Sequence, residues 1–418
     1  MKRKLIIILS VLLPALISKA QEKLVLNDIF SRITANHPDL KMFDAQIRSL
    51  DEAAKGARNW EAPEISTGLW MTPYNPNLWK KQNNGSNGMG QYMISAQQLF
   101  PNGKMLNAEQ NYMRTMSSIE KEKKNASLNG LYAAAKQNYF QLIIIAKKLS
   151  VLDQDEKMLD FMIKNAELRY KNNLGKIGAY YKAKASLGNI ENMRIMLQNE
   201  MVQKRIALNT LMSRDKNINF DIDTSYTIKD YSTYRLDSTA FNNARSDIKA
   251  VDKDIQLTFL QQQVEQAKLK PEFGLRFDHM FGFGGTPMQY SVMGMVKLPM
   301  AGWSSRASKA NVESLKWKVE SLNHQKQTII NEATGIGEGM RSEIESKKKQ
   351  VKLFEENILP ALQKNFQTMQ LGYEQNTEEL FELYDAWETL NMTQIQWLDQ
   401  LQQLLLMQVE IERILEIK

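Results

Sequence analysis

The chain repeats one pattern of short strands followed by long helices, and this repetition limits the folds that it can adopt. A Pro-Glu pair at 63–64 returns at 271–272, and each pair opens a short alternating segment. A second alternating segment ends in Pro-Asn-Gly at 101–103 and in Pro-Met-Ala-Gly at 299–302. Because one copy can neither close a sheet nor bury a helical face alone, the two copies must pack together.

The pattern predicts a mainly α fold with two copies of a strand, strand, long helix, long helix unit. The first copy covers 21–213, with a helix over 24–58, strands at about 64–72 and 91–100, and a helical hairpin over 104–213. The second copy covers 246–418, with strands at about 272–281 and 288–298 and a helical hairpin over 303–417. A polar link over 214–245 joins the copies and is expected to pack beside the helices.

Each predicted strand alternates apolar with polar or small residues, as in Phe-Gly-Leu-Arg-Phe-Asp at 273–278. About ten residues is the length of a tilted membrane-spanning strand, although a soluble sheet with one wet face would alternate in the same way. Four strands cannot close a barrel, and an open edge cannot lie in lipid. If these are membrane strands, they therefore require self-association.

The helical segments are unusually long and regular. Residues 104–170 contain no proline and a single glycine, Gly130, so a continuous helix would extend roughly 100 Å. The last helix carries a heptad seam that an ordinary coiled coil would also show. The seam consists of Leu383, Trp387, Leu390, Trp397, Leu401, Leu404, Ile411 and Leu415.

The first twenty residues are typical of a secretory signal, with a basic start at 2–4, an apolar run over 5–17 and a small residue at Ala20. The chain has no cysteine, which excludes disulfides and an N-terminal cysteine lipid anchor. Of 54 basic residues four lie in the signal, leaving 50 against 47 acidic residues, a net charge of +3. Such a mixed surface is not a nucleic-acid footprint.

Several short motifs occur in a characteristic order. They are His37-Pro38-Asp39-Leu40, Pro63 and Pro271 before the strands, Leu99-Phe100-Pro101-Asn102-Gly103-Lys104, Ile358-Leu359-Pro360-Ala361, and Leu371-Gly372-Tyr373 leading to Leu383-Tyr384-Asp385-Ala386. With the duplication and the signal, they make the chain resemble the TolC-like outer membrane efflux protein family. The resemblance implies a homotrimer with a twelve-stranded β-barrel in the outer membrane of a Gram-negative bacterium and an α-helical barrel in the periplasm. It also implies a periplasmic adaptor and an inner-membrane pump as partners.

Four acidic residues follow the turn of the second helical hairpin: Glu378, Glu379, Glu382 and Asp385. Glu382 and Asp385 are three positions apart, so they share a helical face that could line a pore and favour cations. The resemblance places gate residues at these two positions, whereas a solvated helix face is the structural alternative. Glu378 stands where the family's best-known member has a basic gate residue, so a latch built on that residue is not expected here.

The two hairpin turns differ in charge although they correspond in sequence. The first carries Gly175, Lys176, Ala179 and Lys182 at the positions of the four acids. The turns also supply the residues that we expect to contact an adaptor: Asn172, Asn173, Gly175, Lys176, Gln375 and Asn376. The acids therefore mark the second turn as the predicted gate.

No catalytic constellation, cofactor motif or metal-spaced histidine pair is present, which predicts a protein that is not an enzyme. The 23 methionines include Met288, Met293, Met295 and Met300 around one strand. Thioethers bind Cu(I), but methionine also fills apolar faces adaptably, and with only three histidines we interpret these residues as filler.

The sequence predicts a passive outer-membrane duct through which small molecules or metal ions leave the cell. Two alternatives are a periplasmic coiled-coil scaffold or adaptor and the outer-membrane duct of a type I protein secretion system.

Overall fold

The computed structural model describes residues 22–172, 177–299 and 301–417, so the predicted signal lies outside the described residues. The chain divides into two compact units (unit 1 and unit 2), each built from three stretches. Unit 1 takes the residues up to His37 with Leu131–Asp230 and Glu343–Glu410, and unit 2 takes Pro38–Gly130, Tyr231–Ser342 and the residues from Ile411. The compact units are therefore not the two sequence copies, because each unit draws on both.

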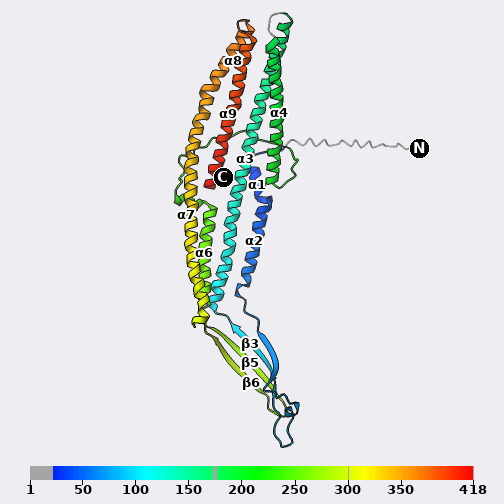
Figure 1. Ribbon diagram of the computed structural model, residues 1–418, viewed down its shortest axis with the longest axis vertical. Coiled ribbons are helices and arrows are strands. Elements are labelled where there is room, and N and C mark those ends of the chain that lie inside the picture. Colours follow the sequence, from blue (N-terminus) through cyan, green and yellow to red (C-terminus); the bar gives the residue numbers. More distant parts are fainter. Residues whose placement is uncertain (1–21, 173–176, 300, 418) are drawn as a thin grey trace, which may run out of the picture. The chain divides into compact units, whose positions relative to one another are not determined.

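Figure 1 colours the elements in their order along the chain and labels most of them. The first copy contains β1 (Glu22–Leu24), α1 (Leu26–Asn36), α2 (Pro38–Lys55), a 3₁₀ turn (Gly56–Arg58), β2 (Glu64–Trp70), a second 3₁₀ turn (Pro76–Trp79), β3 (Gln91–Phe100), α3 (Gly103–Lys171) and α4 (Ile177–Leu211). After it come β4 (Phe220–Ile222), α5 (Ser238–Ala244), α6 (Ser246–Ala267), β5 (Glu272–Gly282), β6 (Gln289–Lys297), α7 (Gly302–Leu353), a π-helical turn (Phe354–Ile358), α8 (Leu359–Glu374) and α9 (Leu380–Leu415).

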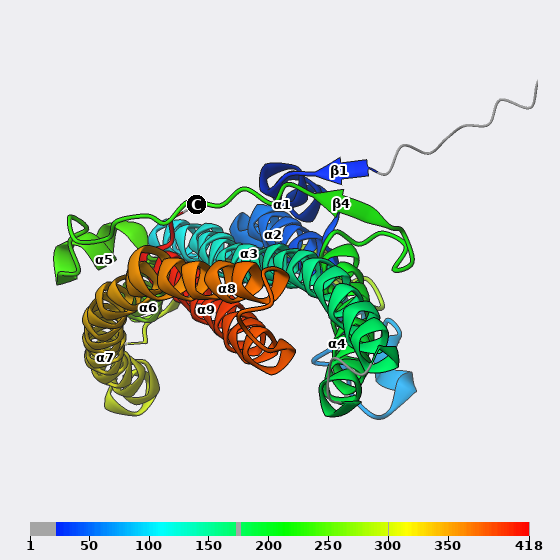
Figure 2. The same ribbon diagram turned by 90° about the horizontal axis from the view of Figure 1, so that it is seen from above.

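In unit 1, parts of α3, α4, α8 and α9 lie side by side around a common apolar core (Figures 1 and 2). Its members include Leu152 and Leu159 of α3, Ile190 of α4 and Leu383 and Trp387 of α9. The predicted heptad seam of α9 is buried, apart from a half-buried Trp397. Packing of one apolar stripe from each helix therefore holds the hairpins together.

Unit 1 also contains a small parallel sheet that the sequence analysis missed. Strands β1 and β4 pair in register from Glu22 opposite Phe220 to Leu24 opposite Ile222. The Glu22 carboxylate accepts hydrogen bonds from Arg32 and from Arg214, whose Nη1 is 2.7 Å away, and these bonds lower the pKa of Glu22. Three-residue strands are too short to show alternation, so the expectation of a helix from residue 24 was wrong at its start.

Unit 2 contains the four-stranded antiparallel sheet, in the order β2-β3-β5-β6. Strands β2 and β3 come from the first copy and β5 and β6 from the second, so the β3–β5 pairing joins the copies. The predicted duplicated unit is confirmed, and β2 and β6 are the two edges of this sheet.

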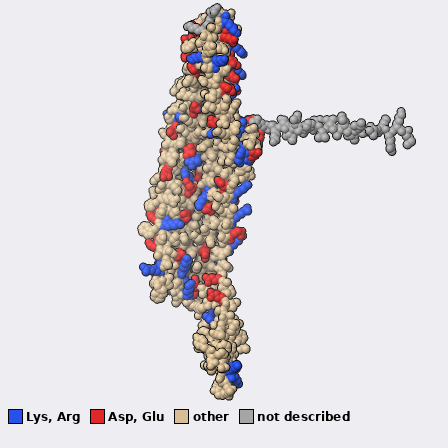
Figure 3. Space-filling view, turned by 45° about the vertical axis from the view of Figure 1, so that its right-hand side comes forward, with Lys and Arg blue, Asp and Glu red and all other residues tan. Residues whose placement is uncertain are grey.

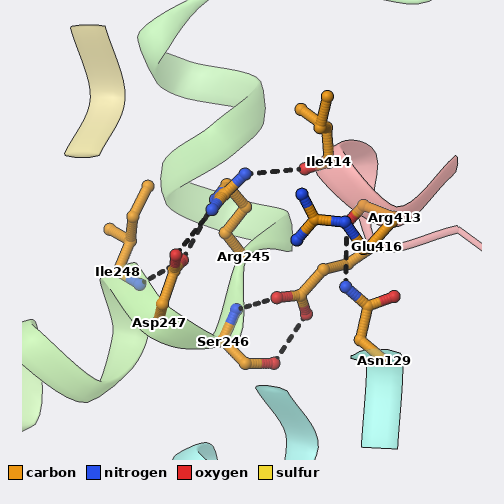
Figure 4. Close-up of polar contacts among 8 residues, drawn as sticks. All are labelled: Asn129, Arg245, Ser246, Asp247, Ile248, Arg413, Ile414 and Glu416. Atoms are coloured by element: carbon orange, nitrogen blue, oxygen red, sulfur yellow. Dashed lines mark hydrogen bonds and ion pairs between the residues drawn. The ribbon is translucent and has the colours of Figure 1, made fainter. Parts of the chain in front are cut away.

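The end of α9 and the start of α6 cap each other in unit 2 (Figure 4). Glu416 accepts hydrogen bonds from the backbone N–H of Ser246 at 2.9 Å and from its hydroxyl at 2.7 Å. In return, Arg245 Nη1 donates to the carbonyl of Ile414 at 3.0 Å, and Asn129 Nδ2 donates to that of Arg413 at 2.8 Å. Because helix ends leave backbone groups unpaired, these contacts complete both termini.

Candidate functional site

The sheet of unit 2 has one face of apolar side chains that are exposed. Pairing places Ile65 opposite Ala96, Ala96 opposite Phe277 and Phe277 opposite Val292, so one apolar row crosses all four strands. Further exposed members of the face are Leu69, Tyr92, Ile94, Phe273, Leu275, Tyr290 and Val296. Little of this face is covered within the chain, since the exposed fractions of its large side chains range from 39% for Tyr92 to 75% for Ile65. The face shown in Figure 3 carries few charges over the strands and many over the helices.

The opposite face of the sheet holds a compact polar network around Asp278. This carboxylate is 1% exposed and accepts hydrogen bonds from Arg276 Nε at 2.8 Å and Ser291 Oγ at 2.9 Å, and a further one from Ser95. Lys297 Nζ and Glu272 form an ion pair of 2.9 Å near the end of the strands. Asp278, Arg276, Glu272 and Lys297 are thus paired, and the face is suited to contact water rather than an apolar medium.

Aromatic residues lie at both ends of the strands, and two loops at one end are hydrogen-bonded to each other. Trp60 and Phe100 meet edge to face at 5.5 Å, and Trp79 stacks on Phe283 at 5.4 Å beyond the other end. The loop after β2 is bound to the β5–β6 loop, because the N–H of Gly88 donates to the carbonyl of Gly284 at 2.9 Å. Aromatic side chains at both ends of apolar strands are typical of membrane interfaces.

The predicted gate acids lie around the start of α9 in unit 1, and they divide into two kinds. Glu382 and Asp385 are exposed on α9, and no ion pair is recorded for either among the described residues. Glu379 is also exposed and lies in the turn before α9. These three side chains are available to a solvent-filled space, which agrees with both a pore lining and a solvated face.

Glu378 is instead part of the turn itself. A Cβ on Gly372 would lie 2.5 Å from the Glu378 Cγ, so this side chain packs directly over the glycine. The Gly372 carbonyl accepts from the N–H groups of Thr377 and Glu378 at 2.9 and 3.2 Å, and from the Thr377 hydroxyl at 3.0 Å. The structure therefore separates Glu378 from the exposed pair Glu382 and Asp385.

Two residues that the sequence did not indicate as site residues, Glu388 and Lys182, lie next to the predicted gate acids. Glu388 lies one turn after Asp385 on α9, and its Oε2 is 3.6 Å from Lys182 Nζ of α4. The Glu388 Oε1 also accepts a hydrogen bond from the Tyr384 hydroxyl at 3.0 Å. Glu388 therefore continues the three-residue spacing of Glu382 and Asp385 along α9. Its ion pair with Lys182 also connects α9 to α4.

The predicted tip residues are only partly within the described residues. Asn173, Gly175 and Lys176 lie outside them, whereas Asn172 caps its own helix by donating to the carbonyl of Leu168 at 2.8 Å. In the second turn, Gln375 and Asn376 are exposed, and Asn376 accepts a hydrogen bond from Arg169 of α3.

A buried carboxyl group lies within the helical core of unit 1. Asp155 of α3 accepts hydrogen bonds from the Trp387 indole at 2.9 Å and from the Asn391 amide. Burial raises the pKa of Asp155 to about 6, against the lowering effect of these two donors. Ionisation of the Asp155 carboxyl group therefore lowers the stability of the folded protein.

Within the part of the chain that the structure describes, no group of three or more His, Asp or Glu side chains is placed to hold a metal ion. Met293 and Met295 lie on the polar face of the sheet, opposite Arg276 and Gly274. Their role as filler remains a prediction, and Met300 lies outside the described residues.

Among the helices of the described residues, none combines the length and the apolar character needed to cross a membrane.

Comparisons with known proteins agree with this geometry. Residues 29–214 match the outer membrane efflux protein family.

The fold is similar to that of the outer-membrane channel OprN, with a TM-score of 0.73, 15% identity, and coverage of 93% of this chain and 89% of that chain. It is also similar to the outer membrane protein VceC of Vibrio cholerae, with a TM-score of 0.71, 14% identity, and coverage of 93% and 95%. The same holds for the MtrE outer membrane channel of Neisseria gonorrhoeae, with a TM-score of 0.71, 12% identity, and coverage of 94% and 89%. Comparison with curated proteins gave no match. The predicted resemblance and fold class are confirmed.

Proposed function

Since this chain matches the outer membrane efflux protein family over residues 29–214 and shares the fold of outer membrane channels, we propose that it is the outer-membrane exit duct of a tripartite efflux system. Three copies would each contribute four strands to a twelve-stranded barrel and their long helices to a periplasmic helical barrel. A periplasmic adaptor and an inner-membrane pump would deliver small molecules or metal ions to it. The duct itself performs no chemistry, and the pump supplies the energy.

The observation that carries the proposal is the polarity of the sheet. Its apolar face is exposed, while its only buried charged group, Asp278, lies on the opposite face. Transfer of each large apolar side chain out of water is worth about 1.5–3 kcal/mol, so a face of this size requires an apolar environment. Contact with lipid meets that requirement, and the paired polar face would then line the water-filled interior.

The open edges of the sheet support assembly from several copies. Strands β2 and β6 have no partner on their outer sides within the described sheet. Because unpaired backbone groups are not tolerated in lipid, β2 of one copy would pair with β6 of the next. The number three is taken from the family resemblance.

Glu382 and Asp385 support a cation-favouring entrance in this assembly. Both are exposed on one face of α9, and no basic partner is recorded for either in the described part of unit 1. A ring of copies would gather these carboxylates around the axis and attract cations. The turn residues Gln375 and Asn376 are exposed, and we propose that they contact the adaptor.

The soluble scaffold alternative fits the structure less well, because it would leave the apolar face of the sheet in water. Membrane fractionation and planar-bilayer recording separate the two. We expect detergent-dependent extraction as a trimer and single-channel conductance with cation selectivity. A protein that is monomeric and soluble without detergent would overturn the proposed duct.

The entrance is tested with the double variant Glu382→Ala and Asp385→Ala, recorded as the reversal potential in a salt gradient. We expect reduced cation selectivity with an intact trimer. The matched control is Glu313→Ala with Glu320→Ala, which removes two exposed acids from α7. An equal change in both double variants would show a general charge effect and remove Glu382 and Asp385 from the gate.

A further inference from the structure

The ammonium group of Lys182 lies against two aromatic rings and a carboxylate of α9. Its Nζ is 4.2 Å from the ring centroid of Tyr384, 4.8 Å from that of Phe381 and 3.6 Å from Glu388 Oε2. An ammonium attracted to ring faces is a cation–π contact, and two rings with one acid are the components of a cation-binding box.

The α9 side of this box is held in place independently of Lys182. The Tyr384 hydroxyl donates to Glu388 at 3.0 Å and is also hydrogen-bonded to Ser186 of α4. Its ring contacts that of Trp387, with 5.4 Å between centroids. Tyr384 is 2% exposed, so its position is set by packing and its outer ring face is covered in part by Lys182.

Lys182 can leave this box more readily than its α9 partners can. Its side chain is 38% exposed, and Phe381 is 51% exposed at the rim. A long, flexible lysine regains hydration and rotamer freedom when its ammonium moves into water. Departure of Lys182 would expose an aromatic surface next to a carboxylate whose only other recorded partner is a neutral hydroxyl.

We propose that Phe381, Tyr384 and Glu388 form a binding site for monovalent organic cations, with the Lys182 ammonium as the occupant that such a ligand replaces. A quaternary ammonium group suits the site because it cannot donate hydrogen bonds and depends on ring faces and a single opposite charge. The positive end of the α9 dipole opposes a cation here. The acids Glu379, Glu382 and Asp385 around the first turn of α9 offset that effect.

For transport, this inference rests on the proposed duct and narrows its cargo. The exposed acids would concentrate cations of every kind, whereas the aromatic box would retain those that carry an alkylammonium group. Binding itself requires no conduction, and this allows the two proposals to fail separately.

The test is calorimetric titration of the detergent-solubilised protein with tetraethylammonium. Lys182→Met keeps most of the side-chain length and removes the competing charge, so we expect at least tenfold tighter binding than in the wild type. Lys184→Met is the matched control, because Lys184 lies at 5.8 Å from the single ring of Tyr180 and is exposed. That variant should bind as the wild type does.

Two further changes locate the ligand. In the Lys182→Met background, Glu388→Gln or Phe381→Leu should return the affinity to the wild-type level or below. Lys182→Arg provides a second measurement if Lys182→Met does not fold, because a stacked guanidinium should weaken binding below that of the wild type.

Equal affinities in wild type, Lys182→Met and Lys184→Met would overturn the inference, as would tight binding that survives both further changes. Loss of binding in a protein that still conducts would reject the cation site alone. Binding without any conductance would reject the duct alone.

Discussion

The sheet of unit 2 and the helical core of unit 1 are built with opposite polarity. In the helical core, Leu383 and its neighbours are fully buried, while Glu382 and Asp385 of the same helix are exposed. In the sheet, Phe273, Phe277 and Tyr290 are exposed and Asp278 is buried. Both regions follow ordinary patterning, with period 3.6 in one and period 2 in the other.

The difference shows that the two regions were shaped by different surroundings. A helix with apolar residues inside is stable in water, because its polar face is hydrated. A sheet with apolar residues outside is stable only where those residues meet lipid or another protein. Single substitutions that place a charge on the apolar face of the sheet, or that change the buried side chains of the helical core, test this difference directly.

The largest effect is expected for a charge on the apolar face of the sheet. Phe277→Asp places a carboxylate where we expect lipid, at a cost per subunit somewhat below the roughly 2–4 kcal/mol of an arginine or lysine at the membrane midplane. Three copies would multiply this cost, so little assembled protein should remain in the outer membrane fraction. Immunoblotting of unheated membrane samples measures the trimer.

Phe259→Asp on α6 is the matched control for this change, because Phe259 is 49% exposed and Phe277 is 47% exposed. The control should retain assembly, since α6 lies among the helices rather than in the sheet. Equal loss of trimer in both variants would contradict the opposite-polarity interpretation.

A smaller effect on assembly is expected for a cavity in the helical core. Leu383→Ala removes a fully buried side chain from the packing of α9 against its neighbours. Such changes cost roughly 2–5 kcal/mol, depending on how far the site relaxes. Thermal unfolding of the helices, followed by circular dichroism in detergent, should therefore shift to lower temperature. Leu168→Ala, at an exposed position on α3, should leave the transition unchanged.

The smallest effect is the pH dependence that the buried acid Asp155 gives to the same core. Its pKa is about 6 in the folded protein against an ordinary value of 3.8, because burial disfavours the charge. The folded state thus binds the Asp155 proton more tightly than the unfolded state does. The contribution of Asp155 to the free energy of unfolding therefore falls as pH rises from about 4 to about 6. The total loss above that range is up to about 3 kcal/mol.

Asp155→Asn should remove this part of the pH dependence of the helical unfolding temperature. Asp153→Asn is the control on the same helix, where the carboxylate is 62% exposed and lies 3.1 Å from Arg194. If both variants keep the wild-type pH profile, Asp155 is not the group that titrates.

Much of the fold could be predicted because its signals are periodic and long. The alternation at 273–278 identified the two faces of β5, and the seam from Leu383 to Leu415 identified the buried side of α9. Strands β1 and β4 were missed because three residues carry no readable period. The compact units were missed because they depend on which parts of each long helix pack together.

The candidate site could be predicted only where it lies within one helical turn. The spacing of Glu382 and Asp385 is local, and the structure places both on the exposed surface of α9. The pairing of Glu388 with Lys182 joins residues more than 200 positions apart, and no local pattern indicates it. The packing of Glu378 over Gly372 likewise depends on the turn geometry rather than on residue type.

The mutual cap between Glu416 and Ser246 has a consequence for the order in which the chain can fold during synthesis. Residues from Ile411 onward are made after every other element of unit 2. Until they emerge from the ribosome, the start of α6 lacks its acceptor, and Arg245 and Asn129 lack the carbonyls they bind. The mutual cap of unit 2 therefore forms only after these last residues are made, and neither unit can be excised as one continuous fragment.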